Sequence, residues 1–474
     1  MGLSVLNFKG AGTIKVTMSL LTKNLVLVCC LVYAANTCAQ ANEILPLEPC
    51  KAVAETEALG LADVVELALC GNPQTREVWA NARYQEAQLA ISQAAYLPTV
   101  NGTLGVSHSL SDRVGTVSPI DTKSAALTLS YLIYDFGARS ATVENARQLL
   151  AAAAATQDNM VQTIFLAAVQ AFYQVQAAQA ALASVKEAER SALESLKAAT
   201  LRGKVGSGAP ADRLQAQTAY SQASLNRIQA EGSLRSAQGS LANVIGRDAN
   251  RPIQLIATGT IELPTDFERE VDALIATARE QRPDLLSAEA QIKAAQANVD
   301  TVRTSDLPTL VMGGTATNSR SDVLSQGNTY NLSLNLNVPI YSGRAATNRV
   351  YAAQAQVETR IAQRDLLQRQ VALDVWNAYQ NLQTATQSLR STADLVNSAE
   401  QSERVASARY QAGVGSLLDV LVAQSALASA RQQRVQASYN WNIYRATLAQ
   451  AMGSLDVKLL STHSPEQSAE KSQP

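Results

Sequence analysis

The chain has 474 residues, with 39 lysines and arginines against 40 aspartates and glutamates. This near-neutral balance provides no basic stripe of the kind that binds nucleic acid, so we expect no nucleic-acid partner. Two histidines, His108 and His463, leave little material for a metal site or a general base. Composition therefore argues against an enzyme that depends on histidine, and we expect no metal site.

The N-terminus has the pattern of a secretory signal peptide. Lys23 precedes an apolar run of about ten residues, and small residues follow, with cleavage expected after Ala39 or Ala41. The run is shorter than the roughly 20 apolar residues of a membrane-spanning helix. We therefore assign residues 1–39 to a signal peptide; lipidation at Cys38 is the alternative.

Two cysteines remain after cleavage, Cys50 and Cys70. In an oxidising compartment an isolated pair at this spacing is expected to form one disulfide. The alternative is a pair of buried free thiols.

Helical stretches dominate the rest of the chain and come in matching pairs. In chain order we expect helices over about 61–96, 138–201, 210–245, 271–306, 345–410 and 417–452. The two long stretches, of about 64 residues each, would extend about 95 Å as helices. In the second, Val375, Leu382, Leu389 and Val396 recur at the seven-residue spacing of coiled coils. The sequence thus predicts a wall of long helices beside pairs of half-length helices stacked end to end.

Four runs between the helices read as strands, joined in pairs by polar loops over 111–124 and 319–329. The clearest, Leu332–Val338, alternates strictly between apolar and polar residues. The others are Thr103–Leu110, Leu127–Tyr131 and Val311–Asn318. Such alternation fits a sheet with one apolar and one wet face, as in membrane barrels, although a small soluble hairpin is the alternative. Four strands cannot close a barrel, whereas three copies of the chain would supply twelve.

The chain repeats itself at a glycine-bearing break in each half. One constant offset separates Arg202 from Arg409, Gly206 from Gly413, Asp212 from Asp419 and Gln217 from Gln424. A period this long indicates a duplicated half-molecule rather than a solenoid of small repeats. We expect a first repeat over 40–250, a connector over 251–270, a second repeat over 271–453 and a disordered tail over 454–474.

This arrangement resembles the TolC-like outer membrane efflux protein family over essentially the whole mature chain. The motifs that carry the resemblance are Tyr410-x-x-Gly413-x-x-x-x-x-Asp419-Val-Leu-x-Ala423-Gln424, Arg282-Pro283-Asp-Leu285 and Val338-Pro339-Ile-Tyr341-x-Gly343. The region around Cys50 and Cys70 looks most like the CyaE-type branch, whose members serve type I secretion of large toxins. Multidrug or small-molecule efflux is the alternative within the family.

The resemblance implies a mainly α-helical protein with a transmembrane β-barrel in the bacterial outer membrane. A homotrimer would form a twelve-stranded barrel among the outer membrane lipids and a twelve-helix tunnel through the periplasm. It would act without a cofactor and without catalysis, docking onto a periplasmic adaptor protein and an inner-membrane ABC or RND pump.

The resemblance also implies a periplasmic gate at the two glycine breaks. The predicted gate residues are Gly206, Gly208, Asp212, Gly413, Gly415 and Asp419. Glycine is expected there because tight turns need positive φ, and an aspartate ring at the entrance would favour cations. Alternatively, both aspartates simply complement a helix N-terminus. The residues expected to dock the adaptor are Arg202, Arg409 and Tyr410.

Two positions depart from the family pattern. Gly415 stands where some relatives carry an arginine that ties the gate shut, and Val422 stands where a second aspartate occurs. The family's locking network therefore cannot be transferred to this chain. Two alternatives from other classes are a periplasmic adaptor and a secreted structural coiled coil. Pro98, Pro308 and Pro339 argue against the coiled coil because they interrupt continuous heptads.

Overall fold

The computed structural model describes residues 58–113, 116–205, 209–250, 253–256, 270–321 and 327–455. All of them belong to one compact unit, Cys50–Pro474. The predicted signal peptide and nearly all of the predicted tail lie outside the described residues. The elements of the first half are α2 (Leu61–Gly71), α3 (Pro73–Ala94), β1 (Thr99–Arg113), β2 (Thr116–Tyr134), α4 (Ala138–Lys204) and α5 (Pro210–Val244). Those of the second half are α6 (Val271–Gln281), α7 (Pro283–Thr304), β3 (Thr309–Ser321), β4 (Gly327–Asn337), α8 (Ala345–Gln411) and α9 (Leu417–Ala451).

The two halves are built alike, which confirms the predicted duplication. Helices α2 and α6 have 11 residues each, and α3 and α7 have 22 residues each. The long helices α4 and α8 both have 67 residues, and α5 and α9 both have 35 residues. Each half therefore repeats one order of elements: two short helices, a strand pair, a long helix and a half-length helix.

The prediction of single helices over 61–96 and 271–306 is wrong, because each is broken by a proline. Pro73 and Pro283 are the first residues of α3 and α7. A proline disfavours helical geometry in the residue before it and has no N–H to donate. Asn72 (ψ 128°) and Arg282 (ψ 124°) are accordingly extended, and each separates two helices.

Three of the four positions in the predicted coiled-coil spacing lie on the face that α8 buries, whereas the fourth, Val396, is only partly buried. The buried residues of this face recur at alternating intervals of three and four: Val371, Val375, Ala378, Leu382, Ala385 and Leu389. Side chains at this spacing share one face of a helix and pack into the adjoining helices. They form an apolar cluster with residues of α6 and α9, including Leu274 and Trp441.

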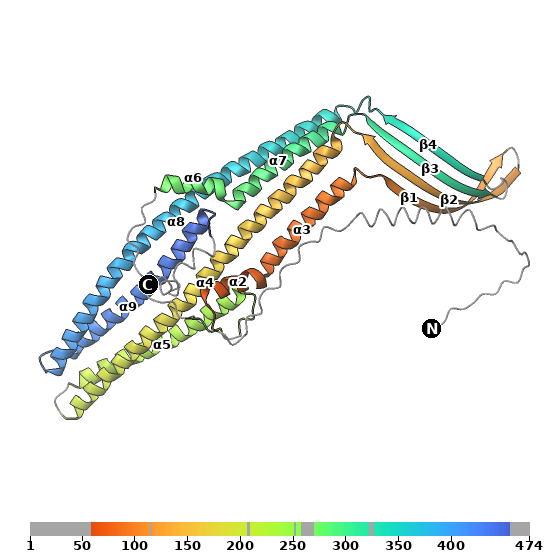
Figure 1. Ribbon diagram of the computed structural model, residues 1–474. Coiled ribbons are helices and arrows are strands. Elements are labelled where there is room, and N and C mark those ends of the chain that lie inside the picture. The colour runs from red at the N-terminus through yellow and green to blue at the C-terminus, as the bar shows by residue number, and fades with distance from the viewer. Residues whose placement is uncertain are drawn as a thin grey trace, which may run out of the picture. The chain divides into compact units, whose positions relative to one another are not determined.

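Helix α4 lies in the middle of the helical layer (Figure 1). It packs against α3 and α7 in the half next to the sheet, and against α5 and α9 in the other half. Helix α8 packs against α7 and α9. The sheet thus lies beyond one end of the long helices, and the turns that join α4 to α5 and α8 to α9 lie at the other end.

The half-length helices end where the short helices break. Gly246 follows α5 with a φ of 74°, and a Cβ added to it would lie 2.4 Å from the main-chain oxygen of Gly71. Asn72 Nδ2 donates to the oxygen of Val244, the last residue of α5, at 3.3 Å. In the second half Arg282 Nη1 plays the same part, donating to the oxygen of Ala451 at 3.5 Å. The pieces are stacked end to end, as the sequence predicts.

The four strands form one antiparallel sheet in the order β1-β2-β3-β4. On β4 the apolar side chains Leu332, Leu334 and Leu336 are 77%, 64% and 65% exposed. Ser333 and Asn335 alternate with them on the opposite face, as the period of a strand requires. Within the described sheet β1 and β4 each pair with one neighbour, so each leaves an edge for a further strand.

The described parts of the predicted loops over 111–124 and 319–329 are strand. Strand β1 continues to Arg113, which pairs with Thr116 of β2. Ser319 of β3 likewise pairs with Gly327 of β4. The polar composition suggested loops, but the ladder is made by main-chain groups, so a strand with water on its surface can be polar throughout.

A left-handed turn leads from each strand pair into the long helix. Phe136 and Gly137 have φ values of 51° and 96° before α4, and Gly343 and Arg344 have 62° and 66° before α8. The first turn is held by Asp135, whose Oδ2 accepts hydrogen bonds from the main-chain nitrogen and Nε of Arg139, both at 2.9 Å.

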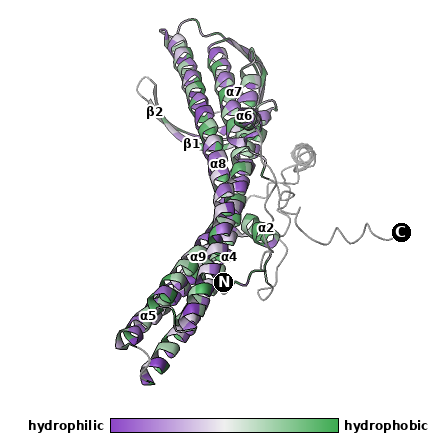
Figure 2. Cartoon of the chain, turned by 90° about the vertical axis from the view of Figure 1, so that its left-hand side faces the viewer, coloured by the Kyte–Doolittle hydropathy of each residue, from purple (hydrophilic) through white to green (hydrophobic). Residues whose placement is uncertain are grey.

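Hydrophilic and hydrophobic residues are mixed along the helices (Figure 2). Across the described segments, no helix combines the length and the apolar content needed to cross a membrane.

Candidate functional site at the ends of the helical hairpins

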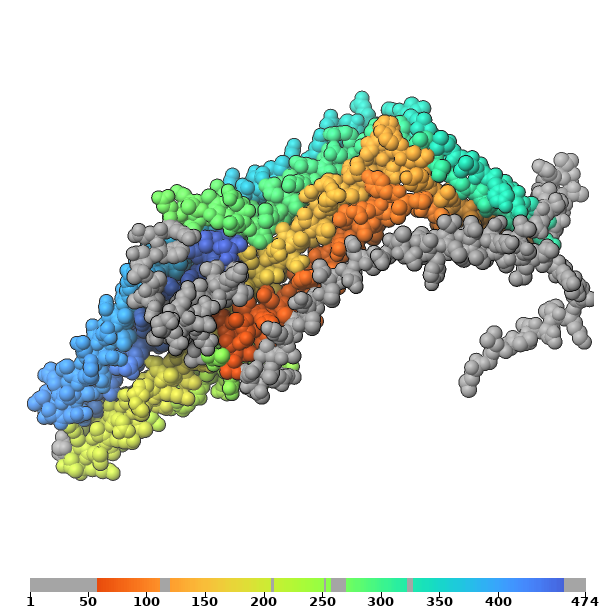
Figure 3. All heavy atoms as spheres, viewed as in Figure 1, coloured from red at the N-terminus to blue at the C-terminus, as the bar shows by residue number. Residues whose placement is uncertain are grey.

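The ends of the α4–α5 and α8–α9 hairpins lie next to each other (Figure 3). A small buried apolar cluster joins them, with side chains from all four helices. Its buried members are Ala199, Ala216, Tyr410, Leu417 and Val420. Most of the predicted gate and docking residues lie on or beside this cluster.

The end of α8 is closed by a left-handed glycine. Gly413 has a φ of 79°, as predicted for a tight turn. Its N–H donates to the oxygen of Tyr410 at 3.1 Å, and the N–H of Val414 donates to the oxygen of Arg409 at 3.0 Å. This pair of bonds is a Schellman motif, in which glycine avoids the steric cost that other residues meet at positive φ.

Gly415 is needed for a different reason from the predicted one. It is not among the glycines with positive φ. A Cβ added to it would instead lie 3.0 Å from the Cβ of Arg409 and 3.0 Å from the main-chain nitrogen of Tyr410. The prediction of positive φ at Gly415 is therefore wrong. This glycine lets the turn pass close to the end of α8.

Arg202, in the last turn of α4, reaches across to the end of α8. Its Nη2 donates to the main-chain oxygens of Tyr410 and Gln411 at 2.8 and 3.3 Å. Its guanidinium carbon lies 4.1 Å from the centre of the Tyr410 ring. Carbonyls at a helix C-terminus carry partial negative charge and an aromatic face attracts cations, so both contacts are favourable.

Asp419 caps the start of α9. Its main-chain N–H donates to Ser416 Oγ at 3.1 Å, and its Oδ2 accepts from the N–H of Ser416 at 3.2 Å. The pKa of Asp419 is lowered from its ordinary value, mainly because its carboxylate hydrogen-bonds with the side chain and then the main-chain N–H of Ser416, with a smaller contribution from Arg409. The structure thus shows the helix-capping role that the sequence left as an alternative, with the carboxylate exposed to solvent.

Asp212 lies in the first turn of α5, where its main-chain N–H donates to the oxygen of Ala209 at 3.1 Å. Its place near a helix N-terminus matches that of Asp419 in the second half. A carboxylate there complements the helix dipole.

Gly206, Gly208 and Cys50 lie outside the described residues. Cys70, near the end of α2, is disulfide-bonded. Since no other cysteine lies in the described residues, the pairing of Cys50 with Cys70 stays a prediction.

The three predicted docking residues differ in their accessibility. Tyr410 is 8% exposed, and Arg202 is partly buried against it. Arg409 is the member of this group whose side chain is exposed. A docking role for the three stays a prediction, and in this conformation Arg409 is the one placed for direct contact.

The structure reveals two polar contacts that were not predicted from the sequence. Ser195 Oγ lies 3.3 Å from Gln424 Oε1, linking α4 to α9. Arg282 is 8% exposed, and its guanidinium contacts Asp284 at 2.6 Å and Asp374 at 3.2 Å. The only sequence signal was that Gln424 and Arg282 belong to the motifs quoted for the family resemblance.

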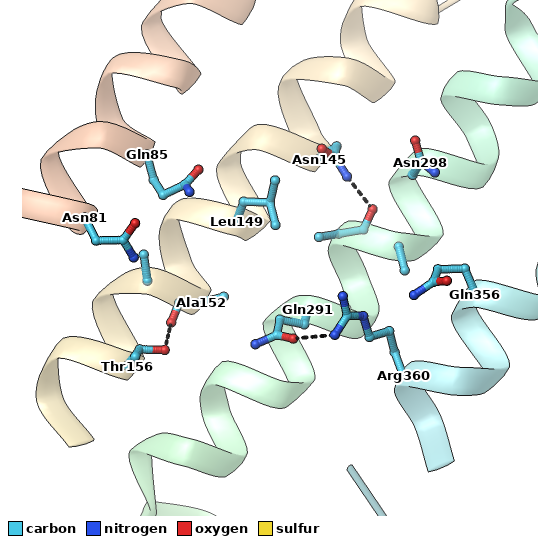
Figure 4. A pocket seen from close by; sticks show the side chains of 13 residues that line it. Asn81, Gln85, Asn145, Leu149, Ala152, Thr156, Gln291, Asn298, Gln356 and Arg360 are labelled. Atoms are coloured by element: carbon cyan, nitrogen blue, oxygen red, sulfur yellow. Dashed lines mark hydrogen bonds between the residues drawn. The ribbon is translucent and has the colours of Figure 1, made fainter. Parts of the chain in front are cut away.

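A pocket of about 320 Å³ lies between α3, α4, α7 and α8 (Figure 4). Carboxamides, small side chains and one guanidinium line it. Asn145 Nδ2 donates to the oxygen of Ala294 at 2.7 Å, and Arg360 Nη1 donates to Gln291 Oε1 at 3.1 Å. The lining supplies no acid–base pair. In the described segments no group of three or more histidines, cysteines, aspartates or glutamates could hold a metal ion.

Two copies of a helical hairpin unit, joined to a four-stranded antiparallel sheet with open edges, define the fold of an outer membrane channel subunit. Comparison with known proteins agrees. The family model described as outer membrane efflux protein matches residues 64–247 and 274–454. The chain therefore belongs to the outer membrane efflux protein family.

Individual relatives cover nearly the whole chain. Protein CyaE of Bordetella pertussis is 30% identical over 88% of this chain and 89% of its own length. Outer membrane protein TolC of Vibrio cholerae is 26% identical over 84% of this chain and 91% of its own. The solved Campylobacter jejuni CmeC outer membrane channel shares the fold with a TM-score of 0.74, at 21% identity, over 83% of this chain and 85% of that one.

The family establishes the general role of the protein. It is an outer membrane channel of a tripartite export system, extends into the periplasm and is not an enzyme. Membership of this family excludes the two alternatives from other classes, namely that the chain is itself a periplasmic adaptor or a secreted structural coiled coil.

Proposed function

We propose that three copies of the chain form the exit duct of a type I protein secretion system. The main observation that supports a trimer is that the four-stranded sheet is open at both edges. In the sheet that the structure describes, strands β1 and β4 each leave one edge unpaired, and four strands are too few to close a barrel. Pairing the β4 edge of one copy with the β1 edge of the next gives twelve strands.

The exposed side chains of the sheet fit this arrangement. Leu104 and Val106 of β1 are 90% and 80% exposed, and the leucines of β4 are exposed to a similar degree. Apolar residues that alternate with polar ones along a strand suit lipid on one side and a water-filled lumen on the other. The lipids of the outer membrane would cover these side chains.

Protein secretion, as opposed to small-molecule efflux, is the finer part of the proposal. Its support is the similarity to Protein CyaE, which at 30% identity exceeds the 26% found with Vibrio cholerae TolC. A periplasmic adaptor and an inner-membrane pump would complete the system. For protein secretion the pump would be an ABC transporter, and for drug efflux it would be an RND pump.

The hairpin ends would form the periplasmic entrance of the duct. We propose Gly206, Gly208, Asp212, Gly413, Gly415 and Asp419 as gate residues and Arg202, Arg409 and Tyr410 as the region that meets the adaptor. The support is the position of the described members at the end of the helices opposite the sheet (Figure 1).

Complementation tests the finer proposal. The full-length gene is expressed in a bacterium that lacks its own duct, once with a type I adaptor, ABC transporter and protein substrate, and once with an RND pump and its adaptor. Protein in the medium and drug tolerance are measured. The proposal predicts restored protein secretion. Restored drug tolerance without secretion, with the protein present in the outer membrane, would favour the efflux alternative.

A further inference from the structure

Within the proposed duct, we propose that Arg202 is a positioning residue that latches the second hairpin to the first and so holds the entrance closed. It would act through the end of α8 and the ring of Tyr410, with no part for the tyrosine hydroxyl. This inference rests on the proposed function, because a latch has meaning only if the hairpin ends form an entrance.

The latch joins two segments far apart in the sequence. Arg202 lies in the last turn of α4, and both of its acceptors belong to the last turn of α8. Its Nη2 is 2.8 Å from the oxygen of Tyr410 and 3.3 Å from the oxygen of Gln411. One side chain therefore ties the first hairpin to the second.

The acceptors are groups that the end of a helix leaves available. The last carbonyls of a helix have no partner within it and carry the negative end of its dipole. In the Schellman turn the oxygen of Tyr410 takes one hydrogen bond, from Gly413, and keeps a second lone pair for Arg202. A guanidinium suits this site because Nη2 can donate to both adjacent carbonyls while the planar group stacks on a ring.

The ring of Tyr410 provides the second contact. The guanidinium carbon lies 4.1 Å from the ring centre, within the range of a cation–π contact. The tyrosine side chain is 8% exposed and packs in the cluster with Leu417 and Val420 of α9. Arg202 therefore holds a ring that is itself fixed to both helices of the second hairpin.

The hydroxyl of Tyr410 is not part of the latch. Its oxygen is buried, and among the described residues it has no hydrogen-bond partner. A buried polar atom without a partner adds nothing favourable to the closed state. A latch through the ring can therefore be distinguished from a latch through a hydrogen bond of the tyrosine hydroxyl. Tyr410→Phe would keep the first and abolish the second.

A second contact on α4 supports the same joint. Ser195 Oγ lies 3.3 Å from Gln424 Oε1 of α9. Residues 195 and 202 are two turns apart, so α4 presents a row of contacts to the second hairpin. Arg202 lies at the outer end of this row, where the hairpins must separate first if the entrance is to widen.

The test uses single-channel recordings of the full-length protein in planar bilayers. Arg202→Gln should raise the open fraction roughly tenfold. Arg202→Lys should give an intermediate value, because it keeps the charge but not the planar group that stacks on the ring. Tyr410→Leu should open the channel less than Arg202→Gln does, because the main-chain oxygens can still accept from Arg202, and Tyr410→Phe should stay closed like the wild type. Lys204→Gln is the matched control, since Lys204 is an exposed cation in the same helical turn.

Combining Tyr410→Leu with Arg202→Gln should add little to the effect of Arg202→Gln, because loss of the guanidinium already removes the contact with the ring. An open fraction at the wild-type level in Arg202→Gln or Arg202→Lys would overturn the latch. So would equal opening by the phenylalanine and leucine variants, which would assign the lock to the hydroxyl. If Arg202→Gln does not assemble, the open fraction of Arg202→Lys alone tests the latch. Absence of any conductance from the wild-type protein would instead contradict the proposed duct and, with it, the entrance that the latch requires.

Discussion

At the scale of single residues, glycines at the hairpin ends serve different purposes. Gly413 provides a left-handed turn, whereas Gly415 leaves room beside Arg409. The sequence showed that glycine recurs at both breaks, but a recurring glycine cannot reveal whether backbone conformation or close contact requires it. That distinction depends on how the turn folds back on the end of α8.

Gly413→Ala should destabilise the protein, because a Cβ at φ 79° meets the steric cost of the left-handed region, about 1–2 kcal/mol. Gly232→Ala is the matched control. Gly232 lies inside α5 with nothing within 4 Å of an added Cβ, so alanine there should stabilise by about 0.5–1 kcal/mol. Thermal unfolding of the two variants measures the difference. Equal midpoints would contradict the assigned role of Gly413.

Asp419 should make the start of α9 sensitive to acid. Its folded pKa lies below the ordinary value of 3.8 because hydrogen bonds with the side chain and the main-chain N–H of Ser416 favour the charged carboxylate. A lowered folded pKa means that the stabilisation is present above pH 3.8 and is lost as the pH falls through the folded value. Amide hydrogen exchange of residues 416–420, corrected for the intrinsic pH dependence, should show protection falling below that pH. Asp419→Asn should show no such step; a step of the same size in that variant would refute the assignment.

At the scale of the elements, periodicity predicted the helices well. The spacing of Val375, Leu382 and Leu389 is the buried face of α8. The breaks at Pro73 and Pro283 could also have been predicted, since proline excludes helical geometry in the preceding residue. Periodicity shows which face of an element is buried but not which element covers it. The contact of Arg202 with the end of α8 therefore could not be predicted from periodicity.

The break between α6 and α7 should depend strongly on Arg282. Its side chain is 10% exposed and contacts Asp284 and Asp374. Removing one partner of a buried ionic cluster leaves the other charges unpaired and costs about 3–5 kcal/mol, less here because Asp374 is 37% exposed. Arg282→Ala should lower the unfolding midpoint clearly, whereas Arg279→Ala, at an exposed site in the last turn of α6, should change it little. Similar midpoints for the two variants would contradict this account.

At the scale of the whole molecule, the duplication gives one chain two equivalent hairpins, and three chains would place six around a common axis. Such a ring would alternate between first and second hairpins. The contacts of Arg202 and Ser195 join the two kinds within a chain. Contacts between chains would then be made by the outward faces of α3 and α8, which expose Ile91 and Leu366 at 64% and 69%.

The central claim is that the open sheet closes by association of three chains. It is tested most directly by measuring the mass of the protein in the complex extracted from outer membranes in mild detergent, using light scattering that separates protein from detergent. We expect three times the mass of the mature chain. A mass equal to one mature chain, in protein that retains its helical content, would contradict it.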